Sequence, residues 1–434
     1  MAQTHDVVIV GAGLAGLAAA RQLAIHGADV RVVEAADAVG GRVRSDHIDG
    51  FTLDRGFQLY NPAYPEAARV LDHQALDLHS LVRGMDIVRR DRRDRRDRRN
   101  VVHLGDPRSA RNWHLSALSP AAGTVRGKAS FAAYAWQASR LHGAQFDERE
   151  DEPAQVALAR AGLDATLIDQ VLKPFLTGVF LEPHLMTSRR FMDAVLASFV
   201  KGTPALPAAG MQAIPEQLHD ALPPGSVLLS TPATAVGADF VDTDSGRMKA
   251  SVVIVATDAP HTTKLLPGAG IVAAGNSVTT WYHTVAASEL PRPLAGGRSV
   301  ITVEAQRSGP VINTVPLTYS VPSYAPDGQV LVSTSALGAD AEREQQVREQ
   351  LGRLYGVDTS SWQAIAAYPI EYALPSMRGP LSLAPPRFDE PVLIAGDHRA
   401  TASIQGAMVS GRRAADCALH RLGIRRADER RVVA

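Results

Sequence analysis

The stretch Asp6-Val-Val-Ile-Val-Gly11-Ala-Gly13-Leu-Ala-Gly16 decides the fold at the start of this chain. Its first five residues form a short β-branched run, which is typical of a buried parallel strand. Residues 17–25, after the glycines, have the composition of a helix that ends near Gly27. A second β-branched run, 30–33, then ends at Glu34. This order predicts a strand–helix–strand unit.

The glycine spacing in this unit predicts a dinucleotide site. Gly11 permits the tight turn, Gly13 lets the backbone approach a pyrophosphate, and Gly16 lets the helix pack close to the strand. The helix N-terminus supplies partial positive charge to the phosphates. Glu34 ends the second strand, where a carboxylate accepts hydrogen bonds from a ribose. Glycines that only shape a tight turn are the alternative, and the strand-before, helix-after context disfavours it.

Composition narrows the function classes. The 434 residues suffice for two or three domains, and 45 Lys+Arg balance 45 Asp+Glu. This zero net charge argues against a nucleic-acid partner. The single Cys417 excludes a disulfide framework and a thiolate metal cluster. No His-x-x-x-His pair lies beside a suitable carboxylate, so no metal site is expected. No apolar segment approaches the roughly 20 residues that cross a bilayer, and a cytoplasmic location is expected.

Residues 89–99 read Arg-Arg followed by three copies of Asp-Arg-Arg. The runs 86–88 and 101–104 on either side have strand-like composition. We therefore expect the repeat to form a solvated hairpin tip or loop. Contact with a nucleic acid or an anionic membrane is the less favoured alternative.

Two motifs near the N-terminus narrow the dinucleotide. Val39-Gly40-Gly41-Arg42, and the segment 49–58 that contains Gly56, resemble the second signature of the flavin amine oxidase superfamily. That superfamily includes monoamine and polyamine oxidases, protoporphyrinogen oxidases and bacterial phytoene desaturases. The resemblance implies that Gly40, Gly41 and Arg42 lie along the FAD diphosphate and flavin, with the turn at Gly56 close to the isoalloxazine. Glycine amides can meet phosphate oxygens there, and an arginine offers a charged fork.

The resemblance returns in the middle and at the end of the chain. Gly396-Asp397 resembles the segment whose carboxylate binds the ribityl chain, and Ser403-Ile404 resembles the start of the last helix, which points at the flavin edge. Residues 231–236, with Val236 as the expected contact, resemble a strand near the adenine. Because no cysteine lies in the Gly-Asp loop, we expect FAD to bind non-covalently.

These motifs predict an α/β protein with a two-domain, FAD-binding Rossmann-like fold of the glutathione-reductase type. The predicted FAD-binding domain is discontinuous and comprises residues 1–80, 205–265 and 385–434. The predicted substrate domain, a mixed sheet with helices, comprises 81–204 and 266–384.

One departure from the amine oxidases bears on the substrate. Many amine oxidases carry a lysine on the substrate-domain sheet near the flavin, but the strand expected there, 277–284, has none, and Lys264 comes too early. The resemblance thus favours the desaturase and protoporphyrinogen-oxidase-like branch. It implies hydride transfer from an apolar, polyene- or porphyrinogen-like substrate to flavin N5, with dehydrogenation of a carbon–carbon bond. Oxidation of an amine at carbon–nitrogen is the alternative.

The predicted pocket residues come from three places in the sequence. Phe57 and Gln58 directly follow the turn near the flavin. Trp281 and Tyr282 either line the pocket or are ordinary strand residues, and Tyr372 is a candidate to face the flavin. No general base is identified.

The sequence does not identify the electron acceptor, and O2 and a quinone are the candidates. A lipid substrate would bring peripheral contact with a membrane. The escort-type Rab-binding proteins share this fold without redox chemistry, but the intact glycine motifs argue against that reading.

Overall fold

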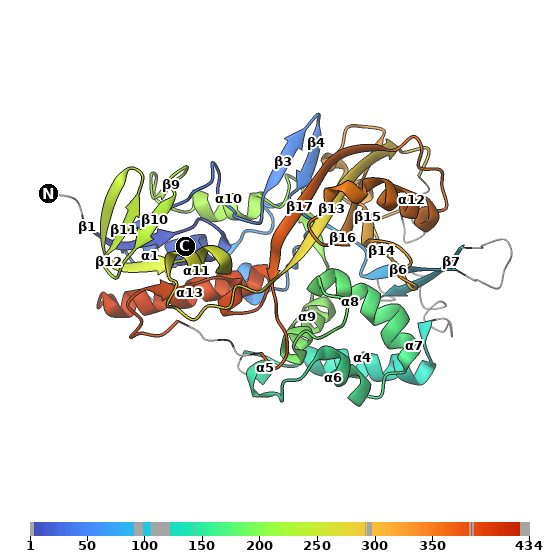
Figure 1. Ribbon diagram of the computed structural model, residues 1–434, viewed down its shortest axis with the longest axis horizontal. Coiled ribbons are helices and arrows are strands. Elements are labelled where there is room, and N and C mark those ends of the chain that lie inside the picture. The colour runs from blue at the N-terminus through green and yellow to red at the C-terminus, as the bar shows by residue number, and fades with distance from the viewer. Residues whose placement is uncertain are drawn as a thin grey trace.

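The computed structural model describes residues 4–90, 99–105, 122–143, 145–290, 292, 297–381, 383 and 386–425. Two sheets form the framework of the molecule, with a group of helices beside the second (Figure 1). Most of the predicted arginine-rich tip, 91–98, and the end of the charged tail, 426–434, lie outside the described residues.

The first sheet has the strand order β10-β11-β12-β1-β2-β9, and β18 pairs with the end of β12, beyond the part that pairs with β11. β1 runs parallel to both β12 and β2, and its Val7, Val8 and Ile9 are fully buried. Strands that are covered on both faces need such β-branched runs. The strand bounds are β1 (Thr4–Val10), β2 (Val30–Val33), β9 (Val227–Leu228), β10 (Ala233–Val236), β11 (Phe240–Thr243), β12 (Gly246–Val255) and β18 (Leu393–Ile394).

Two helices from opposite ends of the sequence pack side by side against this sheet, α1 (Leu14–Ala24) and α13 (Ile404–Arg421) (Figure 1). Each helix has a glycine at a point where neighbouring backbone lies too close for a side chain. A Cβ at Gly16 would lie 1.9 Å from the Gly11 carbonyl oxygen, and one at Gly411 would lie 2.0 Å from that of Ala15. Shorter helices complete this half, namely α2 (Pro65–Val70), α10 (Ala213–Asp220), α11 (Ala259–Leu265) and the 3-10 helix Asp397–Arg399.

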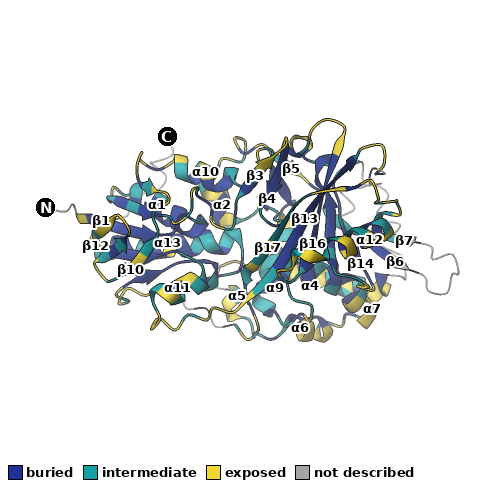
Figure 2. Ribbon diagram, turned by 45° about the horizontal axis from the view of Figure 1, so that its top comes forward, coloured by how far each residue is buried: buried dark blue, intermediate teal, exposed yellow. Residues whose placement is uncertain are grey.

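The second sheet has the order β17-β13-β16-β15-β14-β6-β7 and is antiparallel except for the pair β14 and β6. One face packs on α12 (Glu344–Tyr355), and the other contributes to a second core with the helical group. The central strands of both sheets are buried (Figure 2). The bounds are β6 (Gly84–Arg90), β7 (Arg99–Gly105), β13 (Gly275–Ala286), β14 (Ile301–Glu304), β15 (Val311–Pro316), β16 (Gln329–Leu337) and β17 (Gln363–Pro375).

Short ribbons and turns connect the two halves. β3 (Ser45–Ile48) pairs with β4 (Phe51–Asp54), and β5 (Leu78–Ser80) pairs with β8 (Ala205–Pro207). Two 3-10 helices, Leu317–Tyr319 and Pro322–Tyr324, lie between β15 and β16, and a third, Ala341–Arg343, directly precedes α12.

A group of helices lies beside the second sheet. Apolar residues at three- and four-residue spacing over 151–180 predict helical structure, and the structure forms it as several short helices. A chain reversal at Gly162, whose φ is +77°, separates two of them. The members are α4 (Val125–Ser139), α5 (Gln145–Glu148), α6 (Ala154–Arg160), α7 (Ala165–Leu167), a π-helical turn (Ile168–Leu172), α8 (Lys173–Phe180) and α9 (Arg189–Lys201).

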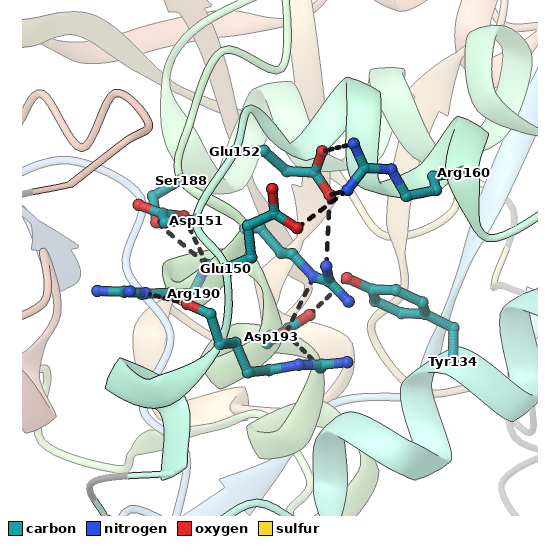
Figure 3. A network of polar contacts seen from close by, with 10 residues as sticks. Tyr134, Glu150, Asp151, Glu152, Arg160, Ser188, Arg190 and Asp193 are labelled. Atoms are coloured by element: carbon teal, nitrogen blue, oxygen red, sulfur yellow. Dashed lines mark hydrogen bonds and ion pairs between the residues drawn. The ribbon is translucent and has the colours of Figure 1, made fainter.

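A buried polar network anchors the first turns of α9 (Figure 3). The fully buried Asp193 accepts hydrogen bonds from the Tyr134 hydroxyl at 2.7 Å and from Arg149 Nη1 at 2.6 Å. At the helix start, the Ser188 hydroxyl donates to Asp151 at 2.7 Å and caps the backbone amides of Arg190 and Phe191. A buried charge must be paired in this way, and the pairing fixes the direction of α9.

The strands of the first sheet fall within the segments predicted for FAD binding, and those of the second sheet fall within the predicted substrate segments. The exact domain bounds stay a prediction. In the described ranges, no helix combines the length and apolar character needed to span a bilayer.

Candidate functional site

A cavity of about 910 Å³ lies between the two sheets and receives side chains from both. Its first-sheet part is lined by the glycine loop after β1, the end of β2, the loop before α11 and the start of α13. Its second-sheet part is lined by β13–β17 and by α8 and α9. Of the predicted cofactor residues, the following line the cavity: Gly11, Gly13, Glu34, Gly40, Gly41, Arg42, Gly56, Gly396, Asp397, Ser403 and Ile404.

The glycine loop forms one end of the cavity. Gly11 has a φ of +102°, which favours glycine. A Cβ on Gly13 would meet no atom within 4 Å, so this position opens onto the cavity. Glu34 accepts hydrogen bonds from the backbone amide of Ala12 at 2.6 Å and from that of Ala36 at 2.9 Å. The carboxylate therefore braces the loop as well as facing the cavity, a role that the sequence motif did not indicate.

Arg42 and Asp397 form a pair at the middle of the cavity. Arg42 Nη2 donates to Asp397 Oδ1 at 2.7 Å, and Nη1 donates to the Ala373 carbonyl at 2.8 Å. Burial alone would lower the pKa of Arg42. The charge and the hydrogen bond of the Asp397 carboxylate have the larger combined effect, so the pKa of Arg42 lies above its ordinary value. The Tyr372 ring lies 5.6 Å from the guanidinium carbon. Arg42 is thus a fixed cation on the cavity wall.

The start of α13 faces the same space. Ser403 and Ile404 line the cavity, and the Ser403 hydroxyl accepts a hydrogen bond from the Gly406 amide at 3.0 Å. The remaining amides of a first helical turn have no partner inside the helix. They give this wall partial positive charge, which suits an anion or a group that becomes negative.

Next to this wall, the turn after β4 joins the two parts of the cavity. Phe57 and Gln58 both line it. Gln58 Nε2 donates to the Arg42 carbonyl at 2.7 Å, and the Phe57 amide donates to the Thr280 hydroxyl at 3.2 Å. The turn is therefore bonded to the second sheet.

Three of the predicted pocket residues do not line the cavity. Trp281 points to the opposite sheet face, where its indole donates to the Ala341 carbonyl at 3.2 Å. Tyr282 is buried beneath the turn, and its hydroxyl donates to the Asp54 carbonyl at 2.7 Å. The Tyr372 ring packs on Arg42 and is not part of the cavity lining. Successive side chains of a strand point to opposite faces of the sheet, so Trp281 and Tyr282 lie on different faces.

Two predicted cofactor residues also lie off the lining. Gly16 instead permits the contact between α1 and the loop. Val236 is replaced on the wall by residues 232–234 at the start of β10.

The wall of the second part of the cavity could not be predicted from the sequence motifs. It is mostly apolar, because aromatic and aliphatic side chains from several elements converge there. They are Tyr60, Tyr64, Phe175, Val179, Leu181, Phe191, Val195, Phe199, Val278, Ile301, Val303, Ile370 and Leu374. The four-residue spacing of Phe191, Val195 and Phe199 predicts that they share one face of a helix. It does not show that this face lines a cavity.

Acidic side chains are confined to one part of the cavity. The carboxylates among the described lining residues are Glu34, Asp258 and Asp397, and each comes from the first-sheet half. The described residues also include no cluster of three or more His, Cys, Asp or Glu side chains that could hold a metal ion.

The first-sheet part fits an adenine dinucleotide on structural grounds. It combines an open glycine backbone at Gly13, a carboxylate at Glu34 and two helix N-termini. The model of one family, described as flavin-containing amine oxidoreductase, matches residues 14–419. The chain belongs to this family. Membership confirms the predicted family, the flavin cofactor and the oxidoreductase class.

The relatives of this chain within the family differ in the substrates that their names give. The chain is 45% identical to putrescine oxidase of Kocuria rosea over 79 residues, 18% of this chain and 16% of that protein. It is 40% identical to the zeta-carotene-forming phytoene desaturase of Myxococcus xanthus over 83 residues, 19% of this chain and 16% of that protein. These alignments span less than a fifth of each relative's length.

Similarity of fold extends over nearly the whole chain. A structure of putrescine oxidase bound to putrescine has a TM-score of 0.67 and 21% identity, and the match covers 95% of this chain and 98% of that one. An oxidoreductase from Methanosarcina mazei has a TM-score of 0.69 and 15% identity, covering 94% and 98%. The predicted fold class is confirmed.

Proposed function

We propose that this chain binds FAD non-covalently in the first-sheet part of the cavity and removes two electrons from an apolar substrate in the second part. The observation that carries this proposal is the division of one cavity into a polar, glycine-lined part and a mostly apolar part. The reaction is dehydrogenation of a carbon–carbon bond in a polyene- or porphyrinogen-like molecule.

The cofactor residues act by position and charge. Gly11 and Gly13 leave room for the pyrophosphate, and Glu34 accepts hydrogen bonds from the adenosine ribose. Arg42, held by Asp397, and the first turn of α13 place positive charge along the rest of the site. A flavin bound there would supply the redox chemistry: one C–H bond of the substrate would give up a hydride equivalent, and the neighbouring C–H bond would lose a proton to solvent as the double bond forms.

The second part of the cavity orients the substrate and excludes water. Phe175, Phe191 and Phe199 offer apolar surface, and burial of such surface is favourable by about 25 cal/mol per Å². A protonated amine in this wall would lack a carboxylate partner among the described lining residues. An ammonium buried without a partner is strongly disfavoured, and an apolar substrate is favoured.

Oxidation of an amine at carbon–nitrogen is the second candidate. The identity to putrescine oxidase supports it, but the position of the acidic side chains does not.

The proposal also includes the remaining partners and the location. The electron acceptor is O2 or a quinone, and the protein acts in the cytoplasm. A lipid-like substrate would bring peripheral membrane contact.

Product analysis tests the proposal. Purified holoenzyme is incubated with a polyene, a porphyrinogen or a diamine, under air or with a soluble quinone, and the products are analysed by mass spectrometry. We expect loss of one pair of hydrogens from the polyene or the porphyrinogen. Conversion of the diamine alone to an aldehyde would overturn the apolar assignment. Acid precipitation should release all the flavin into solution, as a non-covalent cofactor requires.

A further inference from the structure

Three polar side chains lie in a row across the mostly apolar sheet face that lines the second part of the cavity. The strand register places Thr280 of β13 opposite Ser335 of β16, and Ser335 opposite Asn313 of β15. All three line the cavity and are at most 5% exposed. We call these three residues the polar row. Their neighbours on the lining face are apolar, namely Val278, Ile301, Val303 and Ile370.

The hydrogen bonds within the polar row leave acceptor capacity unused. The hydroxyls of Thr280 and Ser335 lie 3.2 Å apart, and the Phe57 amide donates to Thr280 Oγ1 at 3.2 Å. Asn313 Oδ1 is buried and meets no hydrogen-bond donor in the part of the chain that the structure describes. Buried polar groups are nearly always satisfied, so this carboxamide points to a ligand group.

The helix opposite leaves space for the carboxamide. A Cβ on Gly178 of α8 would lie 2.6 Å from Asn313 Nδ2. Any larger residue at this position would press on the amide. Because the two ends of a carboxamide have nearly the same shape, a half-turn about its last bond lets either the oxygen or the nitrogen face a ligand.

Ser198, a polar residue elsewhere on the cavity wall, differs from Asn313 in its hydrogen bonding. The Ser198 hydroxyl of α9 also lines the cavity, but it donates to the Ala194 carbonyl at 2.9 Å. Its only proton is thus used inside its own helix, and it is not among the buried polar atoms that lack any partner. Asn313 has no such partner for its oxygen, although a structural asparagine in a sheet would be expected to have one.

We propose that the polar row binds one neutral hydrogen-bond donor, a hydroxyl or a pyrrole-type N–H, on an otherwise apolar substrate. Asn313 accepts the hydrogen bond, and Ser335 and Thr280 extend the polar strip toward the turn at Phe57. This inference rests on the proposed function and narrows it. A pure hydrocarbon polyene has no such donor, whereas a hydroxylated polyene or a porphyrinogen has one.

Matched probes test the polar row without turnover. Oxidised holoenzyme is titrated with 2-naphthol and with 2-methylnaphthalene, which share an apolar body but differ in the donor, and binding is followed by the change in flavin absorbance. We expect 2-naphthol to bind at least about tenfold more tightly. Asn313→Leu should reduce the preference to about twofold or less. Ser198→Ala, the matched control, should keep the wild-type preference.

Several outcomes would overturn the inference. Equal binding of the two probes, or binding of neither, would show that the polar row offers no accessible acceptor. A preference that persists in Asn313→Leu would place the donor elsewhere. If Asn313→Leu loses flavin or unfolds, Asn313→Asp in the same titration replaces it: its carboxylate retains an acceptor, so loss of the preference there would contradict the inference.

Failure of the proposed function would look different. A donor preference that depends on Asn313, combined with oxidation of a donor-bearing amine, would retain the polar row and reject the carbon–carbon reaction. Oxidation of a polyene combined with equal binding of the two probes would retain the carbon–carbon reaction and reject the role of the polar row.

Discussion

Arg42 Nη2 lies 2.7 Å from Asp397 Oδ1, although 355 residues separate the two in the sequence. The same guanidinium donates to the Ala373 carbonyl of β17 at 2.8 Å. One arginine therefore joins the loop after β2, the last segment of the first sheet and a strand of the second sheet. These contacts meet at the point where the two parts of the cavity adjoin.

Arg42→Met tests this junction. The change leaves the Asp397 carboxylate, which is 5% exposed, without its partner, and the free energy of unfolding should fall by about 3 kcal/mol. Flavin content should fall as well. The measurement is denaturant unfolding with the flavin-to-protein ratio. Arg247→Met, which breaks an exposed pair with Asp242, is the control and should lower the stability clearly less, because water screens that pair. Equal costs for the two variants would contradict the account.

Gly13→Val should yield protein without flavin. The new side chain would project into the cavity, because no protein atom lies within 4 Å of its Cβ position, and it would block the pyrophosphate. The flavin absorbance per mole of purified protein measures the loss. Gly268→Val is the control, since that position is also open and lies off the cavity lining. Full flavin occupancy in Gly13→Val would reject the assignment of this loop.

Glu34 has two expected roles, and two variants separate them. Glu34→Ala removes the acceptors for both the Ala12 and the Ala36 amides, so FAD affinity and melting temperature should both fall. Glu34→Gln keeps an acceptor oxygen but loses the charge, and its FAD dissociation constant should rise by about tenfold with a smaller thermal effect. Calorimetric titration of the apoprotein gives the constants. An unchanged constant in both variants would leave Glu34 as a loop brace only.

Asp54 should make stability depend on pH. Its buried carboxyl accepts hydrogen bonds from Ser45, Met211 and Tyr324, and burial raises its pKa to about 6. The folded state then binds more protons than the unfolded state between about pH 4 and about pH 6. The contribution of this group is complete below about pH 4 and is lost as the pH rises through its folded pKa.

Asp54→Asn removes this titration. Relative to the variant, the wild type should lose roughly 2 kcal/mol of stability between pH 4 and pH 7. Urea unfolding of both proteins at several pH values measures the difference. Stability profiles that run parallel across this range would contradict the raised pKa.

Local motifs were the most predictable part of the structure. The unit from Asp6 to Glu34 could be read from the sequence because its turn, helix and strands depend on neighbouring residues. Long-range contacts could not be read in this way. Periodicity shows that Trp281 and Tyr282 occupy opposite faces of a strand, but not which face meets the cavity. The pairing of Asn313 with Ser335 depends on sheet register, which no single segment encodes.

The helical stretch was also predicted incompletely, for a related reason. Apolar spacing over 151–180 is compatible with one long helix, but the short helices let several faces reach a single core. The apolar wall of the cavity combines side chains of α8 and α9 with those of three strands of the second sheet, β13, β14 and β17. Its apolar character therefore depends on the tertiary structure.

The most direct measurement is anaerobic reduction of the bound flavin. Purified holoenzyme is mixed without oxygen with putrescine, with a hydroxylated polyene or with a porphyrinogen, and the visible absorbance of the oxidised flavin is followed. The account predicts that the band is bleached by the polyene or the porphyrinogen and is unaffected by putrescine. Bleaching by putrescine alone would contradict it and would identify the chain as an amine oxidase.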